Sequence, residues 1–488
     1  MLDKCFKCII IELKRTEHRY ETGLWDNSRN VVRYTLAIIL YALRFIMIWR
    51  KQMNNIRKLF ARYVSLNILG MIGLSCYVLA DSFFISLAKG ADGLTALNLV
   101  LPLYNLIFAI GSMIGVGSAI RFAIARARGD KDCDNYLPNA LFFTTVIGLV
   151  FSIAGILFPD KILMVLGADD QIVSVGTTYT RIFMSFAPIF MWNYVANAYV
   201  RNDGAPSIAM AATLSSSLFN ILFDYVLMFP LGLGMTGAAL ATALSPIIGI
   251  SVCLVHLLSK KSNVKIKMCR PSLKRLSASC QVGVAAFVAE ISSGVITLIF
   301  NFIILKLAGN IGVAAYGIVA NVSLVAVAVF NGVAQGSQPL VSSSYGKRDM
   351  EDVRTLKRLS FATTVTLAIV MYTAIFIFTH GIVKVFNSEN SVQLTEYAVV
   401  GVRLYFTGIL FAGINIVGGS YLSATEKAKA AFIVFVLRGF ILITAFAFIM
   451  SILFGMNGVW LSYMAAELCT TIVFLILNGK YSKNQYIN

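Results

Sequence analysis

Long apolar stretches fill the chain from residue 63 to residue 478, and they limit the fold more than any other feature. A helix that crosses a bilayer needs about 20 mostly apolar residues, and twelve stretches reach that length. The chain is 58% hydrophobic and only 13% charged, whereas soluble domains are about half apolar and about a quarter charged. We therefore expect an all-α membrane protein with twelve transmembrane helices. The expected helices are 63–87, 94–119, 139–158, 173–199, 207–229, 235–258, 280–306, 312–338, 359–380, 395–422, 430–453 and 457–478.

Lysine and arginine are shared unevenly between the expected loops, and this distribution predicts the orientation. Segment 259–275 alone carries seven basic residues, and others follow the second, fourth, eighth and tenth stretches. The loops on the opposite side carry only Lys89, Lys161, Lys306 and Lys384. Because short cytoplasmic loops retain positive charge, we expect a multi-pass protein of the cell membrane with both ends of the twelve-helix body in the cytoplasm. The net charge of +18 is then a topology signal, and no nucleic-acid binding is expected.

The two halves of the chain resemble each other at a spacing of about 220 residues. The matching positions are 234–240 with 455–461, Arg181 with Arg403, and Gly129 with Gly346. Since each half holds six expected helices, an even number, both halves enter the bilayer in the same sense and form a parallel repeat. Two such lobes with a substrate path between them are typical of transporters. We expect an N-terminal lobe at 53–258, a cytoplasmic linker at 259–279, a C-terminal lobe at 280–478 and a cytoplasmic tail at 479–488.

Residues 1–52 do not fit this scheme. Their apolar run from Val31 to Trp49 is interrupted by Arg33 and Arg44, and a crossing there would put basic residues on the wrong side. We expect an extension that does not span, either an interfacial amphipathic segment or a translated upstream region with Met53 as the functional start. A signal peptide is disfavoured because no small-residue cleavage site follows the run.

Four polar residues of the first half share one depth in the expected bilayer. Asn220 and Asp224 are one helical turn apart, so they lie on one face of their helix. Counting about 1.5 Å per residue from the outer ends places Asp81, Asn220, Asp224 and Thr242 about 8 to 14 Å below the outer boundary. Paired carboxylates with an amide and a hydroxyl can exchange a proton or hold Na⁺. The alternative is that Asp81 and Asp224 only cap or bridge helices.

The other ionisable residues of the expected helices have weaker patterns. Glu290 has no obvious basic partner, and a functional role in the C-terminal lobe and a structural role are equally open. Arg181 and Arg403 lie near the outer face, where long side chains reach the headgroups. Arg438 and Glu467 are expected to be a helix-packing pair or interfacial groups. Three scattered histidines and a lone Cys5–Cys8 pair predict no metal centre and no cofactor.

From about residue 57 onward, the chain resembles the multidrug and toxic compound extrusion (MATE) family in both halves. The resembling segments are 78–84 (Val-Leu-Ala-Asp-Ser-Phe-Phe), 197–204 (Asn-Ala-Tyr-Val-Arg-Asn-Asp-Gly), 220–224 (Asn-Ile-Leu-Phe-Asp), 237–242 (Gly-Ala-Ala-Leu-Ala-Thr) and 335–340 (Gln-Gly-Ser-Gln-Pro-Leu). The resemblance implies a two-lobe exporter that moves organic cations and amphipathic drugs in exchange for H⁺ or Na⁺.

The resemblance to the prokaryotic branch of the family also implies site residues. It places the cation-coupling site at Asp81, Asn220, Asp224 and Thr242, with Na⁺ held by the two acids if sodium is the ion. Asn197 matches a position in the substrate cavity, and Glu290 matches an acid used by another branch. That branch also uses an aspartate in the tenth helix, where segment 411–415 (Phe-Ala-Gly-Ile-Asn) of this chain has no acid.

Taken together, these features predict multidrug efflux by alternating access, with small-molecule drugs and membrane lipids as partners and a monomer as the working unit. A flippase for a lipid-linked saccharide, from the same broad superfamily, is the alternative. It is disfavoured because the interior charges of the first half are mostly acidic and a thirteenth and fourteenth helix are missing. An intramembrane enzyme is disfavoured because no clustered His or Asp motif ends a helix near the interface.

Overall fold

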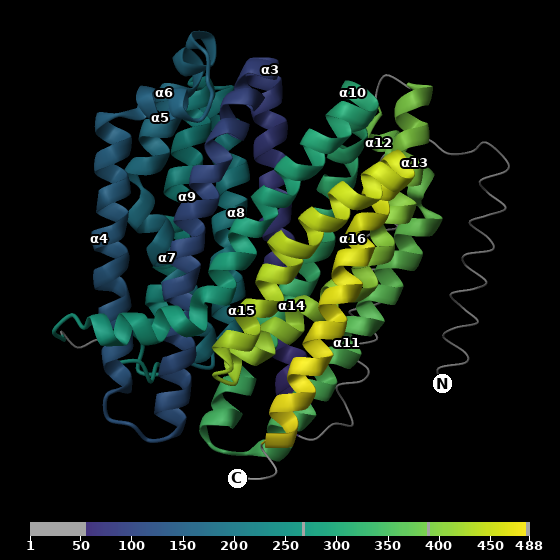
Figure 1. Cartoon of the computed structure of the whole chain (residues 1–488). Coiled ribbons are helices and arrows are strands. Elements are labelled where there is room, and N and C mark those ends of the chain that lie inside the picture. Colours follow the sequence, from purple (N-terminus) through teal and green to yellow (C-terminus); the bar gives the residue numbers. More distant parts are fainter. Residues whose placement is uncertain (1–54, 266–268, 388–390, 485–488) are drawn as a thin grey trace, which may run out of the picture.

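The computed structural model describes residues 55–265, 269–387 and 391–484. Every regular element in these ranges is a helix and none is a strand, which confirms the expected all-α class (Figure 1). The 1–52 extension lies outside the described residues, as do the end of the tail and the Cys5–Cys8 pair.

The first half of the described chain forms one bundle of helices. Helix α3 contains two apolar spans, Asn55–Ile85 and Ala96–Ala127, which lie side by side in Figure 1. Helices α6 and α7 follow one another end to end and make one crossing, because Phe186 ends α6 and Pro188 lies in the first turn of α7. The elements are α3 (Asn55–Ala127), η2 (Cys133–Asn135), α4 (Tyr136–Leu157), α5 (Pro159–Val165), α6 (Asp170–Ser185), α7 (Ala187–Asn202), α8 (Pro206–Met228) and α9 (Gly234–Leu257).

The second half forms a similar bundle. Gly309, with φ of 61°, interrupts α10, and Gly455, with φ of 56°, interrupts α16, so each of these long elements contains a reversal between two crossings. The elements are α10 (Leu273–Gly346), α11 (Met350–Ile377), α12 (Thr379–Phe386), α13 (Val392–Tyr405), η3 (Phe406–Gly408), α14 (Ile409–Ala424), α15 (Ala428–Val436), the π-helix η4 (Leu437–Ile441) and α16 (Leu442–Asn484).

The number of crossings agrees with the expected twelve. Nine stretches of the described residues are long and apolar enough to span. The stretches Leu273–Gly346 and Ala428–Lys480 each contain a glycine reversal and supply two crossings. The α6–α7 pair supplies the remaining one, since each of its helices is only 16 residues long. Several helices begin earlier than expected: α3 starts at Asn55 and α11 at Met350, because their charged first turns extend the helix beyond its apolar part.

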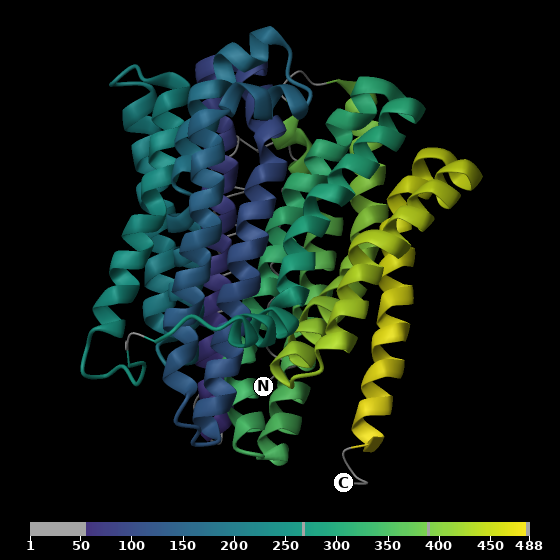
Figure 2. The ribbon, with the colours of Figure 1, turned by 60° about the vertical axis from the view of Figure 1, so that its left-hand side comes forward.

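The two bundles are an N-terminal lobe (55–258) and a C-terminal lobe (273–484), which lie beside each other in Figure 2. Two hydrophobic cores form within the N-terminal lobe. The larger C-terminal core also contains Phe60, Tyr63 and Val64 from the start of α3. The first turns of α3 therefore pack against the opposite lobe.

The internal repeat is visible in the backbone. Gly234 and Gly455, which begin the matching segments, both have positive φ, at 51° and 56°. The second matched turn differs between the lobes. Gly129 has a φ of 77°, but in the other lobe Arg348 and not Gly346 is left-handed. Gly346 lies against α3, where a Cβ would come within 2.6 Å of the Ala127 Cβ, so close packing explains this glycine.

The lobes contact each other through glycines on α10. A Cβ on Gly336 would lie 2.7 Å from the Val64 Cα, and one on Gly332 would lie 2.8 Å from the Ile68 backbone nitrogen. Such small residues let helix backbones approach closely in membranes. Both glycines face α3 in the half of the bundle nearer the turns 128–135, 258–265, 347–349 and 425–427, which we call the basic end.

Polar bonds between the lobes also lie at the basic end. Arg121 of α3 and Arg128, which directly follows α3, both form ion pairs with Glu426 in the turn between α14 and α15, and the Arg128 pair is 2.8 Å long. The Gln338 amide nitrogen donates to the Asn202 side chain at 3.3 Å. The lobes are therefore closed against each other at the basic end.

Candidate functional site

The structure brings the four residues of the predicted coupling site together. Asn220 of α8 donates from Nδ2 to the Thr242 hydroxyl of α9 at 3.3 Å. Asp224 follows Asn220 by one turn, and both side chains are fully buried. Asp81 reaches the cluster from α3, with 8% of its surface exposed, and its carboxylate interacts electrostatically with that of Asp224. Three elements thus supply two carboxylates, an amide and a hydroxyl.

Most oxygens of this cluster lack a hydrogen-bond donor. Oδ1 of Asp81, Oδ1 of Asn220 and both carboxylate oxygens of Asp224 are buried and accept no bond from any residue that the structure describes. Buried polar atoms in folded proteins are nearly always paired. Oxygen atoms from carboxylates and amides are the ligands that hard cations prefer, and a carboxylate can equally take a proton. The cluster therefore fits H⁺ or Na⁺.

Ser217 belongs to the same face of α8 and was missed by the sequence analysis. Its buried hydroxyl also has no partner among the described residues, and it precedes Asn220 by three positions, on the same side of the helix. That spacing was readable, but a serine within an apolar span is common and gave no reason to single it out.

Tyrosines surround Asp81 and were also missed. The Tyr104 and Tyr179 hydroxyls share a hydrogen bond of 2.6 Å, and the Phe183 ring stacks on Tyr104 with centroids 3.6 Å apart. Tyr77, Tyr104 and Tyr179 all interact electrostatically with Asp81. The acid thus lies beside an aromatic wall of the N-terminal lobe.

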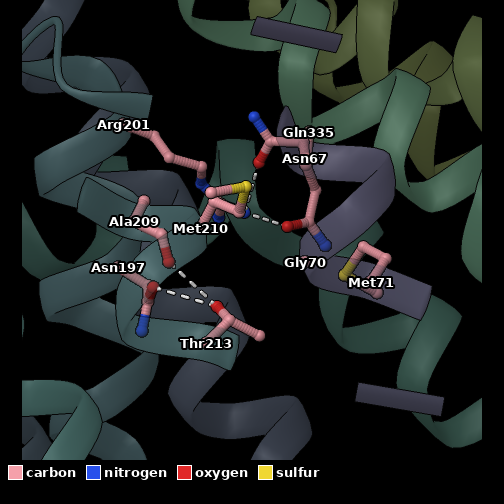
Figure 3. A pocket seen from close by; sticks show the side chains of 9 residues that line it. All are labelled: Asn67, Gly70, Met71, Asn197, Arg201, Ala209, Met210, Thr213 and Gln335. Atoms are coloured by element: carbon pink, nitrogen blue, oxygen red, sulfur yellow. Dashed lines mark hydrogen bonds between the residues drawn. The ribbon is translucent and has the colours of Figure 1, made fainter. Parts of the chain in front are cut away.

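Asn197 lies apart from the coupling cluster. Its amide oxygen accepts a bond from Thr213 of α8 at 3.4 Å, and Thr213 precedes Asn220 by seven residues, about 10 Å along the helix. Asn197 lines a small pocket whose walls come from α3, α7, α8 and α10 (Figure 3). The pocket is lined by Asn67, Gly70, Met71, Asn197, Arg201, Ala209, Met210, Thr213 and Gln335. It lies toward the basic end.

Glu290 is half-buried on α10, at the boundary between the lobes. It interacts electrostatically with Tyr77 of α3 and Tyr194 of α7. In the described part of the chain its carboxylate takes part in no hydrogen bond or ion pair. This acid of the C-terminal lobe therefore lies near tyrosines of the N-terminal lobe.

Both lobes of the chain match one protein-family model. The family model MatE matches residues 67–226 and 285–449, one match in each lobe. The chain belongs to the MATE family. It is therefore a transporter and not an enzyme, as its sequence predicted.

Relatives of this MATE protein are similar over most of their length. The multidrug export protein MepA of Staphylococcus aureus (strain MRSA252) is 27% identical over 409 residues, which cover 82% of this chain and 89% of MepA. MepA of Staphylococcus haemolyticus (strain JCSC1435) is 28% identical over 413 residues, covering 83% and 89%.

Solved transporter structures share the fold. An outward-facing multidrug resistance MATE family transporter of the MOP superfamily superposes with a TM-score of 0.83 at 22% identity, covering 89% of this chain and 97% of that chain. A MOP superfamily transporter from Pyrococcus furiosus superposes with a TM-score of 0.79 at 22% identity, covering 88% and 98%.

The buried acids in the two lobes of this MATE protein differ in their ion-pair partners. In the C-terminal lobe, Glu467 is 2% exposed and pairs with Arg438, whose Nη2 lies 2.5 Å from Glu467 Oε1. Asn415 donates to the other carboxylate oxygen at 2.6 Å. The expected helix-packing pair of Arg438 and Glu467 is thus confirmed. Its charge is balanced within the lobe, whereas Asp81 and Asp224 form no ion pair with any described residue.

Proposed function

We propose that this protein exports organic cations and other amphipathic drugs in exchange for H⁺ or Na⁺, which binds at Asp81, Asn220, Asp224 and Thr242. The observation that carries the proposal is the set of buried oxygens on Asp81, Asn220 and Asp224 that accept no hydrogen bond from any residue in the described ranges. Two uncompensated acids inside a membrane protein are costly unless a cation binds them. The names of the MepA relatives, multidrug export proteins, support drugs as cargo.

Alternating access would link the two transport steps. With the lobes closed at the basic end, as the pairs of Glu426 with Arg121 and Arg128 hold them, the cluster takes up its cation from the opposite side. Neutralising Asp81 removes its repulsion from Asp224 and lets α3 repack against α8. Because α3 also packs into the C-terminal core through Tyr63 and Val64, that movement would be transmitted to the lobe interface and expel the drug.

Asn197 and Glu290 are the proposed residues of the substrate path. Glu290 lies near the N-terminal tyrosines Tyr77 and Tyr194, so its negative charge would attract an organic cation that lies between the lobes. Asn197 offers an amide toward the pocket near the basic end. The moving units would be the lobes 53–258 and 280–478, joined by the linker 259–279. We place this monomer in the cell membrane, with the basic end in the cytoplasm.

The experiment is gradient-driven export by the purified protein in proteoliposomes, with pH and Na⁺ gradients imposed one at a time. Asp81→Asn and Asp224→Asn should each reduce gradient-driven ethidium export to the level of empty vesicles while the protein inserts normally. Asp170→Asn, at an exposed acid in the first turn of α6, is the matched control and should export like the unaltered protein. Unchanged export by both cluster variants would overturn the proposal.

A further inference from the structure

Arg201, near the end of α7, has no counter-charge among the residues that the structure describes. Its Nη1 donates to the Gln335 side-chain oxygen and, at 3.5 Å, to Asn67 Oδ1, and both acceptors are neutral. Its Nε is buried and bonds to nothing in the described ranges. No carboxylate among the described residues forms an ion pair with this guanidinium, although most buried arginines in membrane proteins are paired.

The acid nearest to Arg201 in the sequence already has other hydrogen-bond and ion-pair partners. Asp203, two residues after Arg201, forms an ion pair with Arg126 at 2.8 Å and a hydrogen bond with His256 Nε2 at 2.9 Å. It also accepts bonds from the Ser262 hydroxyl and the Asn263 backbone nitrogen. The coupling acids lie at least two helical turns away, because Asp224 follows Thr213 of the same pocket wall by eleven residues.

The pocket around Arg201 has the chemistry of a site for a small anion. Figure 3 shows the Arg201 side chain among Asn67, Asn197, Thr213 and Gln335, with Met210 in the middle of this group and Met71 at its edge. A buried guanidinium gains most from an anion that it can bind with two parallel N–H groups. The free Nε gives Arg201 a donor for such a bond.

We propose that this pocket binds a small monovalent anion, a halide or a carboxylate, on Arg201. Gln335 comes from α10 of the C-terminal lobe, while Asn67, Asn197 and Arg201 come from the N-terminal lobe. The site is therefore complete only while the lobes are closed at the basic end, and a bound anion stabilises that closed arrangement. The anion can be free in solution or be the carboxylate of a zwitterionic cargo, and only the second source rests on the proposed function.

The test is ³⁶Cl⁻ binding by the purified, full-length protein in nanodiscs, at constant ionic strength in methanesulfonate. We expect saturable binding that Arg201→Gln weakens about tenfold or more, since it removes a charge-assisted bond. The matched control is Arg181→Gln, at an exposed arginine of α6, which should bind chloride like the unaltered protein. Absence of saturable chloride binding, or equal binding by Arg201→Gln, would overturn the proposal.

A second variant separates anion binding from a general loss of stability. Gln335→Glu places a carboxylate on the residue that Arg201 already contacts, so it should abolish chloride binding and raise the melting temperature in chloride-free buffer to that of the unaltered protein in chloride. Chloride binding that survives in this variant also contradicts the site. These readouts need no transport, so they remain informative if drug export fails.

Competition identifies the source of the anion. A zwitterionic fluoroquinolone and its methyl ester differ only in the carboxylate. Displacement of chloride by the acid and not by the ester supports the anion site and assigns it to the cargo. Retention of chloride with both compounds supports the site for a free anion. Equal displacement by acid and ester would show that the carboxylate is not recognised, and it would overturn the cargo assignment.

Discussion

Asn220 donates its amide nitrogen to the Thr242 hydroxyl at 3.3 Å, and its amide oxygen is buried and accepts no hydrogen bond from any described residue. Thr242 therefore fixes which end of the amide points away from it. The amide oxygen can join the oxygens of Asp81 and Asp224 as an acceptor. A single hydroxyl on α9 thus orients an acceptor that belongs to α8.

Thr242→Val should lower the affinity for the coupling ion without abolishing its binding. Valine has a similar shape, so the main loss is the hydrogen bond to Asn220, worth about 1 kcal/mol. We expect half-maximal export to require several-fold more coupling ion, with little change in the maximal rate. Gradient titrations in proteoliposomes measure both quantities.

Thr144→Val is the control for this prediction. Thr144 is fully buried in the same lobe, but its hydroxyl bonds only to carbonyls of its own helix, at 2.8 Å and 3.1 Å. The ion requirement should stay unchanged. An equal shift in both variants would mean that any lost hydroxyl perturbs the lobe, and that Thr242 has no special role.

Glu426→Gln should loosen the closed basic end. It removes the ion pairs of Glu426 with Arg121 and Arg128, each worth at most about 1 kcal/mol because the side chains are partly exposed. It also removes a reason for Glu426 to keep its left-handed backbone, with φ of 59°. The population of the closed state should fall several-fold.

Spin labels at Lys131 and Lys347 report this change, since both residues are exposed at the basic end of different lobes. The variant should show a new population at longer distance. Glu351→Gln, at an exposed acid of α11, should leave the distances as they are. Identical distance distributions for Glu426→Gln and the unaltered protein would show that the ion pairs of Glu426 do not hold the lobes together at the basic end.

Glu467→Gln should destabilise the C-terminal lobe. It leaves the Arg438 guanidinium, whose side chain is 14% exposed, without its counter-charge, and breaking a buried pair costs about 3 to 5 kcal/mol. The melting temperature in detergent should fall by several degrees. Adding Arg438→Met should restore most of it, since removing both charges is often nearly neutral. No recovery in the double variant would show that the pair has a role besides charge balance.

Glu290→Gln should change the preference for cargo and not the coupling. Because Glu290 lies near the N-terminal tyrosines without a cationic partner in the described chain, its charge is available to an organic cation. We expect the KM for ethidium to rise several-fold, while the KM for a neutral amphipathic drug and the ion requirement stay constant. Equal effects on charged and neutral drugs would contradict this role.

The crossings and the grouping of Asp81, Asn220, Asp224 and Thr242 were predictable from the sequence because the bilayer fixes one dimension of the fold. Helix length follows from membrane thickness, and counting residues from the helix ends placed Asp81, Asn220, Asp224 and Thr242 at one depth. The structure brings these four residues together. Depth alone is a strong constraint when helices are nearly parallel.

Other features depend on packing between helices and were not predictable. The π-helix at Leu437–Ile441 and the break at Phe406–Gly408 arise inside apolar runs that look continuous. The partners of Glu426 lie 305 and 298 residues away along the chain, and a loop charge gives no hint of its partner. Ser217 and the tyrosines near Asp81 are residue types that occur in most spans, so only their three-dimensional grouping identifies them.

The glycine contacts between α3 and α10 bring the two lobes closest together near the basic end, so a rotation there would move the opposite ends of the lobes furthest. Gly332 and Gly336 hold the helices together in the half nearer the basic end, while the helices continue far beyond them. For an arm of about 35 Å, the length of the roughly 23 helical residues between Gly309 and Gly332, a rotation of about 10° at these contacts would separate the far ends by about 6 Å. A small movement at the glycine contacts would therefore cause a larger separation of the lobes at the end opposite the basic end. Replacing Gly332 or Gly336 with a larger residue would therefore change the spacing of the lobes most at the end far from the substitution.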